Sequence, residues 1–425
     1  MLTVLGLTFL ATVLVGVPIA FSLGLAAAAT LVAWGQVPLW LLAQRMFTGV
    51  DSFVFMAIPF FILAGELMTT AGILDRLVKF ADGLVGHIRG GLAHVTIVAE
   101  CFFSGISGSA VADAAALSAV LSPSMAKQYD PDFGNGVVAS AAMLGPIIPP
   151  SIPFIIYGVS GNVSIAGLFL GGVGPGILLA GALMVYMYFV ATKRNYPRDP
   201  KTSAKEVLIA AWKALPALFM PVLIMGGILS GMFTPTEAAG VTVIYAALMG
   251  AFYYRKLTIK SLPKVLLTSG LESGMVMLLI AMSEPFAWFV ALDQIPQLII
   301  EWISHLTTSP YVILILVNIF LLILGIPMET VPALVIVTPV LVPIGASVGI
   351  DPVHMGIVIC LNLVLGLITP PVGAVLFAVC GMTNMSLDRL GRAIWPPFLV
   401  SLIVLAIVTY LPWLSTYLPR LVLGR

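Results

Sequence analysis

The segment Gly145-Pro146-Ile147-Ile148-Pro149-Pro150 interrupts a long apolar stretch, and a related segment, Gly366-Leu367-Ile368-Thr369-Pro370-Pro371, lies 221 residues later. Proline removes a backbone donor, so glycine followed by prolines breaks or ends a helix. The same offset relates Asp130-Pro131 to Asp351-Pro352. The sequence therefore predicts two copies of one unit, each with a break inside an apolar helix.

The composition of the chain indicates that these copies lie in a membrane. Only 9% of the 425 residues are charged, whereas about 25% are charged in an ordinary soluble domain. Hydrophobic residues make up 60%, and the net charge of +1 argues against a nucleic-acid binder. Apolar runs of roughly 20 residues predict spanning helices rather than the short alternating strands of a barrel. We expect an all-α polytopic membrane protein.

The copies, about 1–190 and 215–415, are each predicted to hold about five crossings and one reentrant hairpin. In the first copy the expected elements are helices near 2–17, 18–35 and 52–70, hairpin arms 91–104 and 110–125, a broken helix from about 134 to 160, and a last helix over 164–190. Arms of about 15 residues rise only ~22 Å, less than the ~30 Å hydrocarbon core. The hairpin is therefore predicted to enter and leave the membrane on one side.

Basic residues give the orientation of the two copies. Sixteen of the nineteen Lys and Arg residues fall on one predicted face, and the exceptions are Arg45, Arg420 and Arg425. Cytoplasmic segments are enriched in Lys and Arg, so this face is predicted to be the cytoplasm. An odd number of crossings in each copy then makes the second copy inverted relative to the first.

Inverted repeats with discontinuous helices are typical of secondary transporters. The breaks, and the hairpin tips at 104–109 and 324–330, expose backbone and hydroxyl oxygens. Such oxygens favour Na+, whereas the N-termini of broken helices favour an anion. No Lys or Arg lies in either tip or break. An anionic substrate would therefore be held by helix ends, hydroxyls and amides, with bound Na+ nearby.

The tip Ser104-Gly105-Ile106-Ser107-Gly108-Ser109-Ala110-Val111-Ala112-Asp113 resembles the large membrane subunit of tripartite ATP-independent periplasmic (TRAP) transporters. So do residues 145–151, residues 349–354 and the stretch from Asn362 to Gly373, and the resemblance covers nearly the whole chain. It implies an elevator-type, Na+-driven importer in the bacterial inner membrane, which is no enzyme and needs no organic cofactor. It also implies a separate small four-helix membrane subunit and a soluble periplasmic binding protein that delivers an organic acid carrying a carboxylate.

The resemblance also implies site residues. One Na+ site is expected at Ser104, Ser107, Gly145 and Pro149. A second Na+ site is expected at Gly325, Thr330, Gly366 and Thr369. The substrate is expected between the tips, near Ser109, Ser151, Asn362 and Pro371. Asp113 and Glu329 border this region and either support the ion sites or cap hairpin arms.

The same resemblance divides the chain into a scaffold and a moving transport unit. The scaffold is expected at 1–90 and 215–308, and the transport unit at 91–190 and 309–425. Residues 191–214 are expected to form a cytoplasmic linker with an interfacial helix.

Two other functions remain open from the sequence. A self-sufficient Na+/dicarboxylate symporter of related fold would need no small subunit and no binding protein. An intramembrane serine protease is the remote alternative, because Gly105-Ile106-Ser107-Gly108 resembles the GxSG motif of rhomboid proteases, and His94 is the nearest candidate base. The repeat argues against the protease, since one nucleophile needs no second tip.

Overall fold

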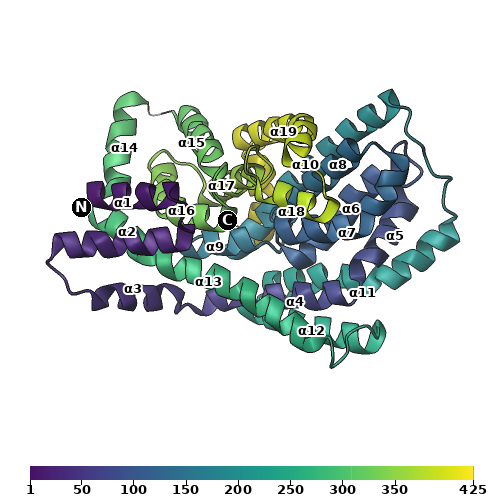
Figure 1. Ribbon diagram of the computed structural model, residues 1–425, viewed down its shortest axis with the longest axis horizontal. Coiled ribbons are helices and arrows are strands. Elements are labelled where there is room, and N and C mark those ends of the chain that lie inside the picture. Colours follow the sequence, from purple (N-terminus) through teal and green to yellow (C-terminus); the bar gives the residue numbers. More distant parts are fainter. Residues whose placement is uncertain (308, 425) are drawn as a thin grey trace.

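The structure is a computed structural model, and it describes residues 1–307 and 309–424. These residues form helices and connecting segments, with no strand among them. In Figure 1 the α6–α7 hairpin and the α15–α16 hairpin lie on opposite sides of the centre, and α9, α17 and α18 are drawn between them.

The first half runs from α1 to α10. Its helices are α1 (Leu2–Leu14), α2 (Ile19–Trp34), α3 (Trp40–Val50), α4 (Ala57–Thr70), α5 (Ile73–Val85), α6 (Gly91–Ser107), α7 (Ala110–Gln128), α8 (Pro131–Ala141), α9 (Ile152–Ser160) and α10 (Ile165–Lys193). Short 3-10 turns, η1 (Phe53–Met56) and η2 (Ala142–Leu144), precede α4 and the first break.

The second half follows the same order. Its helices are α11 (Ala204–Leu229), α12 (Pro235–Leu248), α13 (Leu262–Leu292), α14 (Ile295–Leu306), α15 (Pro310–Gly325), α16 (Thr330–Ser347), α17 (Pro352–Gly366), α18 (Ala374–Thr383), α19 (Leu387–Tyr410) and α20 (Trp413–Leu423). A short π-helical turn, η3 (Met249–Tyr253), extends α12. The hairpin α6–α7 corresponds to α15–α16, and the broken helix α8–α9 corresponds to α17–α18. The repeat predicted from the prolines is confirmed as a repeat of helices.

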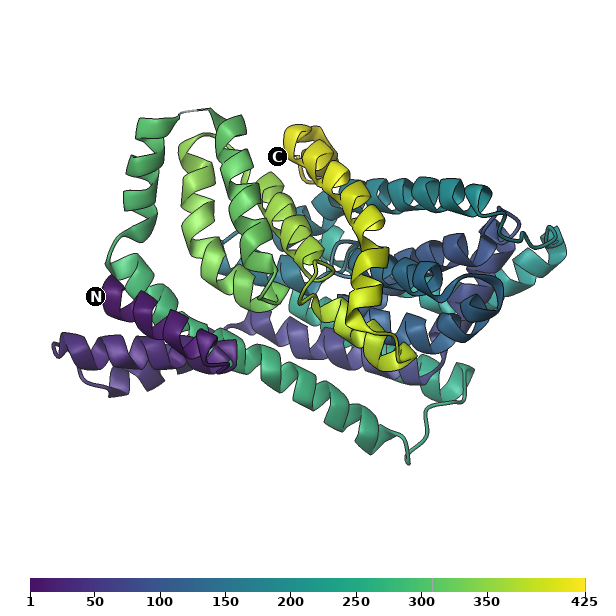
Figure 2. The same ribbon diagram turned by 45° about the horizontal axis from the view of Figure 1, so that its top comes forward.

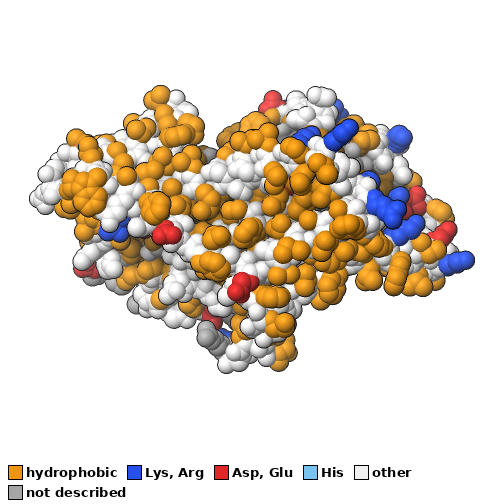
Figure 3. Space-filling view, turned by 90° about the horizontal axis from the view of Figure 1, so that it is seen from below, with side chains coloured by type: hydrophobic (Ala, Val, Ile, Leu, Met, Phe, Trp, Pro, Cys, Tyr) orange, Lys and Arg blue, Asp and Glu red, His pale blue; other side chains and the backbone are white. Residues whose placement is uncertain are grey.

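The fold is that of a multi-pass membrane protein. Among the described residues, seven helices are long and apolar enough to cross a membrane, and several of the shorter helices are also apolar. Most of the face in Figure 3 is hydrophobic, and Lys and Arg side chains gather towards one end of it. Arg425 lies outside the described residues.

The hairpin arms are longer than the sequence analysis expected. The helices α6 and α7 have 17 and 19 residues, because α7 continues through Pro123 to Gln128. Such arms rise ~26 and ~28 Å, so arm length alone does not distinguish a reentrant hairpin from two crossings. The first tip does pack against the first break, since a Cβ added at Gly108 would lie 3.3 Å from the carbonyl oxygen of Pro150.

The division expected at residue 215 falls inside a helix. The helix α11 begins with a capping box between Ser203 and Glu206 and then runs without interruption past Pro216 and Pro221. Proline is tolerated inside membrane helices, because neighbouring groups satisfy the freed carbonyls. The interfacial segment and the first helix of the second copy are therefore one element.

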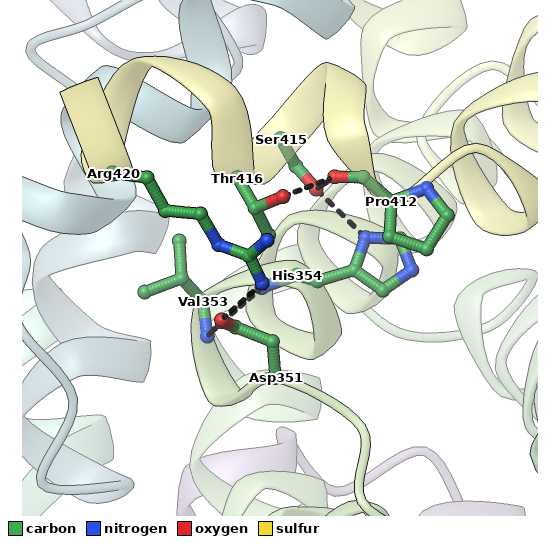
Figure 4. A network of polar contacts seen from close by, with 7 residues as sticks. All are labelled: Asp351, Val353, His354, Pro412, Ser415, Thr416 and Arg420. Atoms are coloured by element: carbon green, nitrogen blue, oxygen red, sulfur yellow. Dashed lines mark hydrogen bonds and ion pairs between the residues drawn. The ribbon is translucent and has the colours of Figure 1, made fainter. Parts of the chain in front are cut away.

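Polar contacts join the C-terminal helix α20 to the start of α17 (Figure 4). Asp351 accepts hydrogen bonds from the N–H groups of Val353 and His354 at 2.9 and 3.3 Å, and Arg420 lies 3.9 Å from its other oxygen. The His354 ring contacts the Ser415 hydroxyl through Nδ1 at 2.7 Å, and it contacts the carbonyl of Thr409 through Nε2 at 3.2 Å. His354 is thereby explained as a structural residue.

The long helix α13 runs beneath both halves in Figures 1 and 2. It packs against α2, α3 and α4 of the first half and against α16 of the second. This arrangement places one face of α13 opposite the region where the tips and breaks meet.

Candidate functional site

A cavity of about 460 Å³ lies where the two tips, the two breaks and α13 come together. The first tip contributes Ser109, the second tip Thr330, the first break Pro146 and the second break Leu367. A further wall is formed by α13 with Ile62 of α4. The repeat thus brings four segments that are far apart in the sequence to a single cavity.

Helix N-termini converge on this cavity. The first residues of α7, α9 and α16 line it, and these helices have 19, 9 and 18 residues. Among the described residues, the N–H groups of Ala110, Val111 and Ile152 have no hydrogen-bond acceptor. Free N–H groups at the positive end of a helix bind anions, and a carboxylate is one such anion.

The first tip and the first break are in close contact. A Cβ added at Gly105 would lie 3.5 Å from the carbonyl oxygen of Pro149, and among the described residues that oxygen accepts no hydrogen bond. A Cβ at Gly145 would collide with the carboxylate of Asp113. The first tip and the first break therefore contact each other through Gly105 and Pro149 and through Asp113 and Gly145.

The second tip and the second break touch through their glycines. A Cβ added at Gly366 would lie 2.5 Å from the carbonyl oxygen and 2.8 Å from the Cα of Gly325. Thr330, at the start of α16, is only 5% exposed, and its hydroxyl has no hydrogen-bond partner. An unpartnered buried oxygen costs free energy unless a ligand satisfies it. The Gly325 carbonyl oxygen and the Thr330 hydroxyl are oxygen ligands of the kind that a cation such as Na+ binds.

The other residues predicted for the Na+ and substrate sites differ in burial and in hydrogen bonding. Ser104 is fully buried, and its hydroxyl donates to the carbonyl of Cys101 at 3.0 Å. Ser107 lines a neighbouring cavity of about 260 Å³, which it shares with Ser109. Ser151 caps α9, and its hydroxyl donates to the Pro146 carbonyl at 2.5 Å. The Thr369 hydroxyl donates to the carbonyl of Leu365.

Three predicted residues lie around the second tip. Glu329 precedes Thr330 and lines the cavity. Asn362 is fully buried behind the tip, where its amide donates to the carbonyl and to the side-chain oxygen of Asn318 at 3.1 and 2.7 Å. Pro371 lies at an exposed position of the second break. Neither Asn362 nor Pro371 is among the residues that line the 460 Å³ cavity.

Two carboxyl groups are buried together behind the first tip. Glu100 and Asp113 are both fully buried, and their side chains interact with each other, with Ser107 close to Asp113. Their four oxygen atoms accept no hydrogen bond from the described residues. Buried carboxyl groups need a cation, a proton or a donor, so this pair adds acceptors to the first tip.

The wall formed by α13 was not predicted from the sequence. Glu272, Met275, Val276 and Leu279 line the cavity, and their spacing of three, one and three residues places them on one helix face. This spacing is visible in the sequence. Nothing in the sequence shows that this face points to the tips rather than to lipid.

The contact that an intramembrane protease requires is absent from the described residues. Neither ring nitrogen of His94 has a hydrogen-bond partner. His94 and Ser107 lie at opposite ends of α6, about 20 Å apart along the helix.

Residues 7–414 match the DctM family, which is described as "Tripartite ATP-independent periplasmic transporter, DctM component". The chain belongs to this family. It is 42% identical over 411 residues to the sialic acid TRAP transporter large permease protein SiaM of Vibrio cholerae, covering 96% of each chain. It is 43% identical over 400 residues to the C4-dicarboxylate TRAP transporter large permease protein DctM of Pseudomonas aeruginosa, covering 94% of each. The resemblance seen in the tips and breaks is thereby confirmed, and this permease subunit is a multi-pass protein of the inner membrane.

The fold also matches a solved structure. The YdaH transporter of Alcanivorax borkumensis, described as having an unusual topology, superposes with a TM-score of 0.63 over 90% of this chain and 88% of its own. The sequence identity is 15%, so this likeness concerns the fold alone.

Proposed function

We propose that this permease subunit imports an organic acid by coupling its movement to Na+. A periplasmic binding protein delivers the acid, and a small membrane subunit completes the transporter. The observation that carries the proposal is the convergence of the N-termini of α7, α9 and α16 on one cavity, which residues of both tips and both breaks line.

The anion would bind at the helix ends. The free N–H groups of Ala110, Val111 and Ile152 belong to residues that line the cavity, and no Lys or Arg is among the described lining residues. Partial charges at helix ends stabilise a carboxylate by less than a full cation would. The anion therefore needs further positive charge, which a bound ion supplies.

Na+ would occupy the two tip–break contacts. The first site would use Ser104, Ser107, Gly145 and Pro149, with Asp113 adjacent to Gly145. The second would use Gly325, Thr330, Gly366 and Thr369, of which Thr330 has a free hydroxyl. Bound Na+ would supply positive charge next to the anion and would hold each tip against its break.

Movement would follow an elevator scheme. Residues 91–190 and 309–425, which hold both hairpins and both breaks, would move as the transport unit against a scaffold of residues 1–90 and 215–308. The cavity supports this division, because α4 and α13 form one wall and the tips and breaks form the others. The first tip also abuts the scaffold, since a Cβ at Gly105 would lie 2.6 Å from Pro221 of α11.

Reconstitution tests the proposal. This chain and the small subunit are placed in proteoliposomes, and the binding protein loaded with its acid is added outside. Uptake is expected with an inward Na+ gradient and is expected to be lost in K+ medium. An imposed proton gradient without Na+ is expected to drive no uptake.

Two results would contradict the proposal. Full uptake in Na+-free medium would show that Na+ is not the coupling ion. Uptake by this chain alone, with neither the small subunit nor the binding protein, would favour a self-sufficient Na+/dicarboxylate symporter.

A further inference from the structure

We infer that the cargo is a monocarboxylate with a compact hydrocarbon body, because free helix N–H groups line part of the cavity and the α13 wall is apolar apart from Glu272. This inference rests on the proposed function and adds the substrate class to it. It depends on the side chains that line the 460 Å³ cavity and on where its few polar groups lie.

The cavity is apolar except at four positions. Of the nineteen residues that line it, only Ser109, Glu272, Glu329 and Thr330 have polar side chains. The two hydroxyls stand at the starts of α7 and α16, next to the helix ends. Three of the four polar side chains therefore lie at the tips, and Glu272 of α13 is the fourth. The other lining side chains can contact only hydrocarbon.

The α13 wall offers an apolar surface to the body of the cargo. Met275, Val276 and Leu279 lie on one face, and Ile62 of α4 lies beside them in the same wall. Met275 is 65% exposed, so its flexible side chain is available to cover a ligand. Burial of hydrocarbon against this surface is favourable in proportion to the area that is removed from water.

A polyhydroxylated acid fits this cavity poorly. Each hydroxyl that leaves water needs a hydrogen-bond partner, and the α13 wall offers none except the Glu272 carboxylate. An added hydroxyl costs about 100-fold in discrimination in an apolar pocket, and several hydroxyls cost more. Sugar acids are therefore disfavoured.

A second carboxylate also fits poorly. Glu272 and Glu329 place negative charge in the cavity, and no basic side chain lines it among the described residues. Glu329 also stands at the start of α16, so it reduces the positive potential of that helix end. The cargo carboxylate is therefore assigned to α7 and α9, where Ala110, Val111 and Ile152 have free N–H groups.

The test compares three acids with the purified complex of this chain and its small subunit in nanodiscs with Na+. The probes are 4-phenylbutyrate, succinate and gluconate, each measured by equilibrium binding of the radiolabelled acid. We expect 4-phenylbutyrate to bind at least about tenfold more tightly than the other two acids.

A nearly isosteric variant identifies the wall responsible. Val276→Thr places a hydroxyl on the apolar face and is expected to reduce the preference for 4-phenylbutyrate over gluconate by about tenfold. The matched control is Val290→Thr, on the same helix but in a cluster with Phe289 and Trp34 away from the cavity. The control is expected to leave the preference unchanged. Because the readout is a ratio of affinities, partial loss of folded protein does not alter it.

Equal or tighter binding of succinate or gluconate would overturn the inference, as would an unchanged preference in Val276→Thr. Binding of none of the probes would also overturn it. Uptake driven by Na+ with the loaded binding protein, measured separately, decides whether the proposed function fails as well. A transporter that moves a sugar acid in a Na+-dependent way would keep the proposed function and reject this substrate class.

Discussion

The α6–α7 and α15–α16 hairpins both place a glycine-containing tip against a helix break, but the polar groups behind the two tips differ. Behind the first tip lie two buried carboxyl groups, Glu100 and Asp113. Behind the second lie amides, with Asn362 bonded to Asn318, which in turn donates to the Thr409 hydroxyl at 3.1 Å. The repeat therefore preserves backbone contacts and varies the side-chain chemistry.

This difference suggests different contributions from the two hairpins. Asn318 of the second hairpin bonds to Asn362 of α17 and to Thr409 of α19, which fixes the position of α15 relative to these two helices. The carboxyl groups of the first hairpin have no hydrogen-bond partner and remain able to bind a cation. We expect the first hairpin to be more sensitive to charge and the second to be more sensitive to packing.

The largest effect is expected from Gly366→Ala. Its Cβ would lie 2.5 Å from the Gly325 carbonyl oxygen, so the second tip must separate from its break. Overpacking costs ~1–3 kcal/mol, and ~3 kcal/mol corresponds to about a 100-fold loss. Na+-driven uptake in proteoliposomes is therefore expected to fall by up to about 100-fold.

Gly270→Ala is the matched control for this variant. Gly270 lies inside α13 with no atom near its Cβ direction, so its uptake is expected to match that of the wild type. Equal uptake by Gly366→Ala and Gly270→Ala would show that the glycine contact is not needed.

The next effect concerns the charge behind the first tip. Asp113→Asn keeps the shape but removes the carboxylate that lies against Gly145. The Na+ concentration for half-maximal uptake is expected to rise about tenfold, which corresponds to ~1.4 kcal/mol. Unchanged Na+ dependence in this variant would contradict the expectation that the first hairpin is the more sensitive to charge.

A smaller effect, on stability, is expected at the second tip. Asn362→Leu leaves the side-chain oxygen of Asn318 without its donor, and an unsatisfied buried group costs ~1–3 kcal/mol. Thermal unfolding in detergent should therefore occur at a lower temperature, whereas the affinity for the acid should change little. A large loss of affinity with unchanged stability would instead place Asn362 at the substrate, as the sequence analysis expected.

Much of the fold could be predicted from glycine and proline. These residues fix where helices break and where hairpins turn, so both breaks and both tips were located from the sequence. The continuous α11 was not predicted, because Pro216 and Pro221 suggest a helix end in the sequence and the helix nevertheless continues past them. The last helix, α20, was also missed, since its attachment depends on contacts of Asp351 and His354 that only the folded chain brings together.

The site was predictable only in part. The tips and breaks have sequence motifs, whereas the α13 wall has only the ordinary spacing of a helix. Asn318 was missed for a similar reason, since a single amide in an apolar helix gives no indication of its partner. Which side chains face one another across the cavity is decided by packing between the two copies.

The smallest effect is expected from the ion pairs at the starts of the two broken helices. Arg194 contacts Asp130 at 2.9 Å, and Arg420 contacts Asp351 at 3.9 Å, with all four side chains more than a third exposed. Exposed pairs contribute ~0–1 kcal/mol. Arg194→Gln should lower the unfolding temperature slightly more than Arg420→Gln, because the Arg194 pair is shorter and also includes Tyr196. The reverse order would contradict this.

Na+ is proposed to provide positive charge for an anion in a cavity that has no basic side chain among its described lining residues. Equilibrium binding of the delivered acid to the membrane complex, titrated at increasing Na+ with K+ as the balancing ion, tests this claim most directly. The affinity for the acid is expected to rise at least about tenfold with Na+, and the acid must then raise the affinity for Na+ by the same factor. Binding of the acid that is equally tight with and without Na+ would contradict the claim.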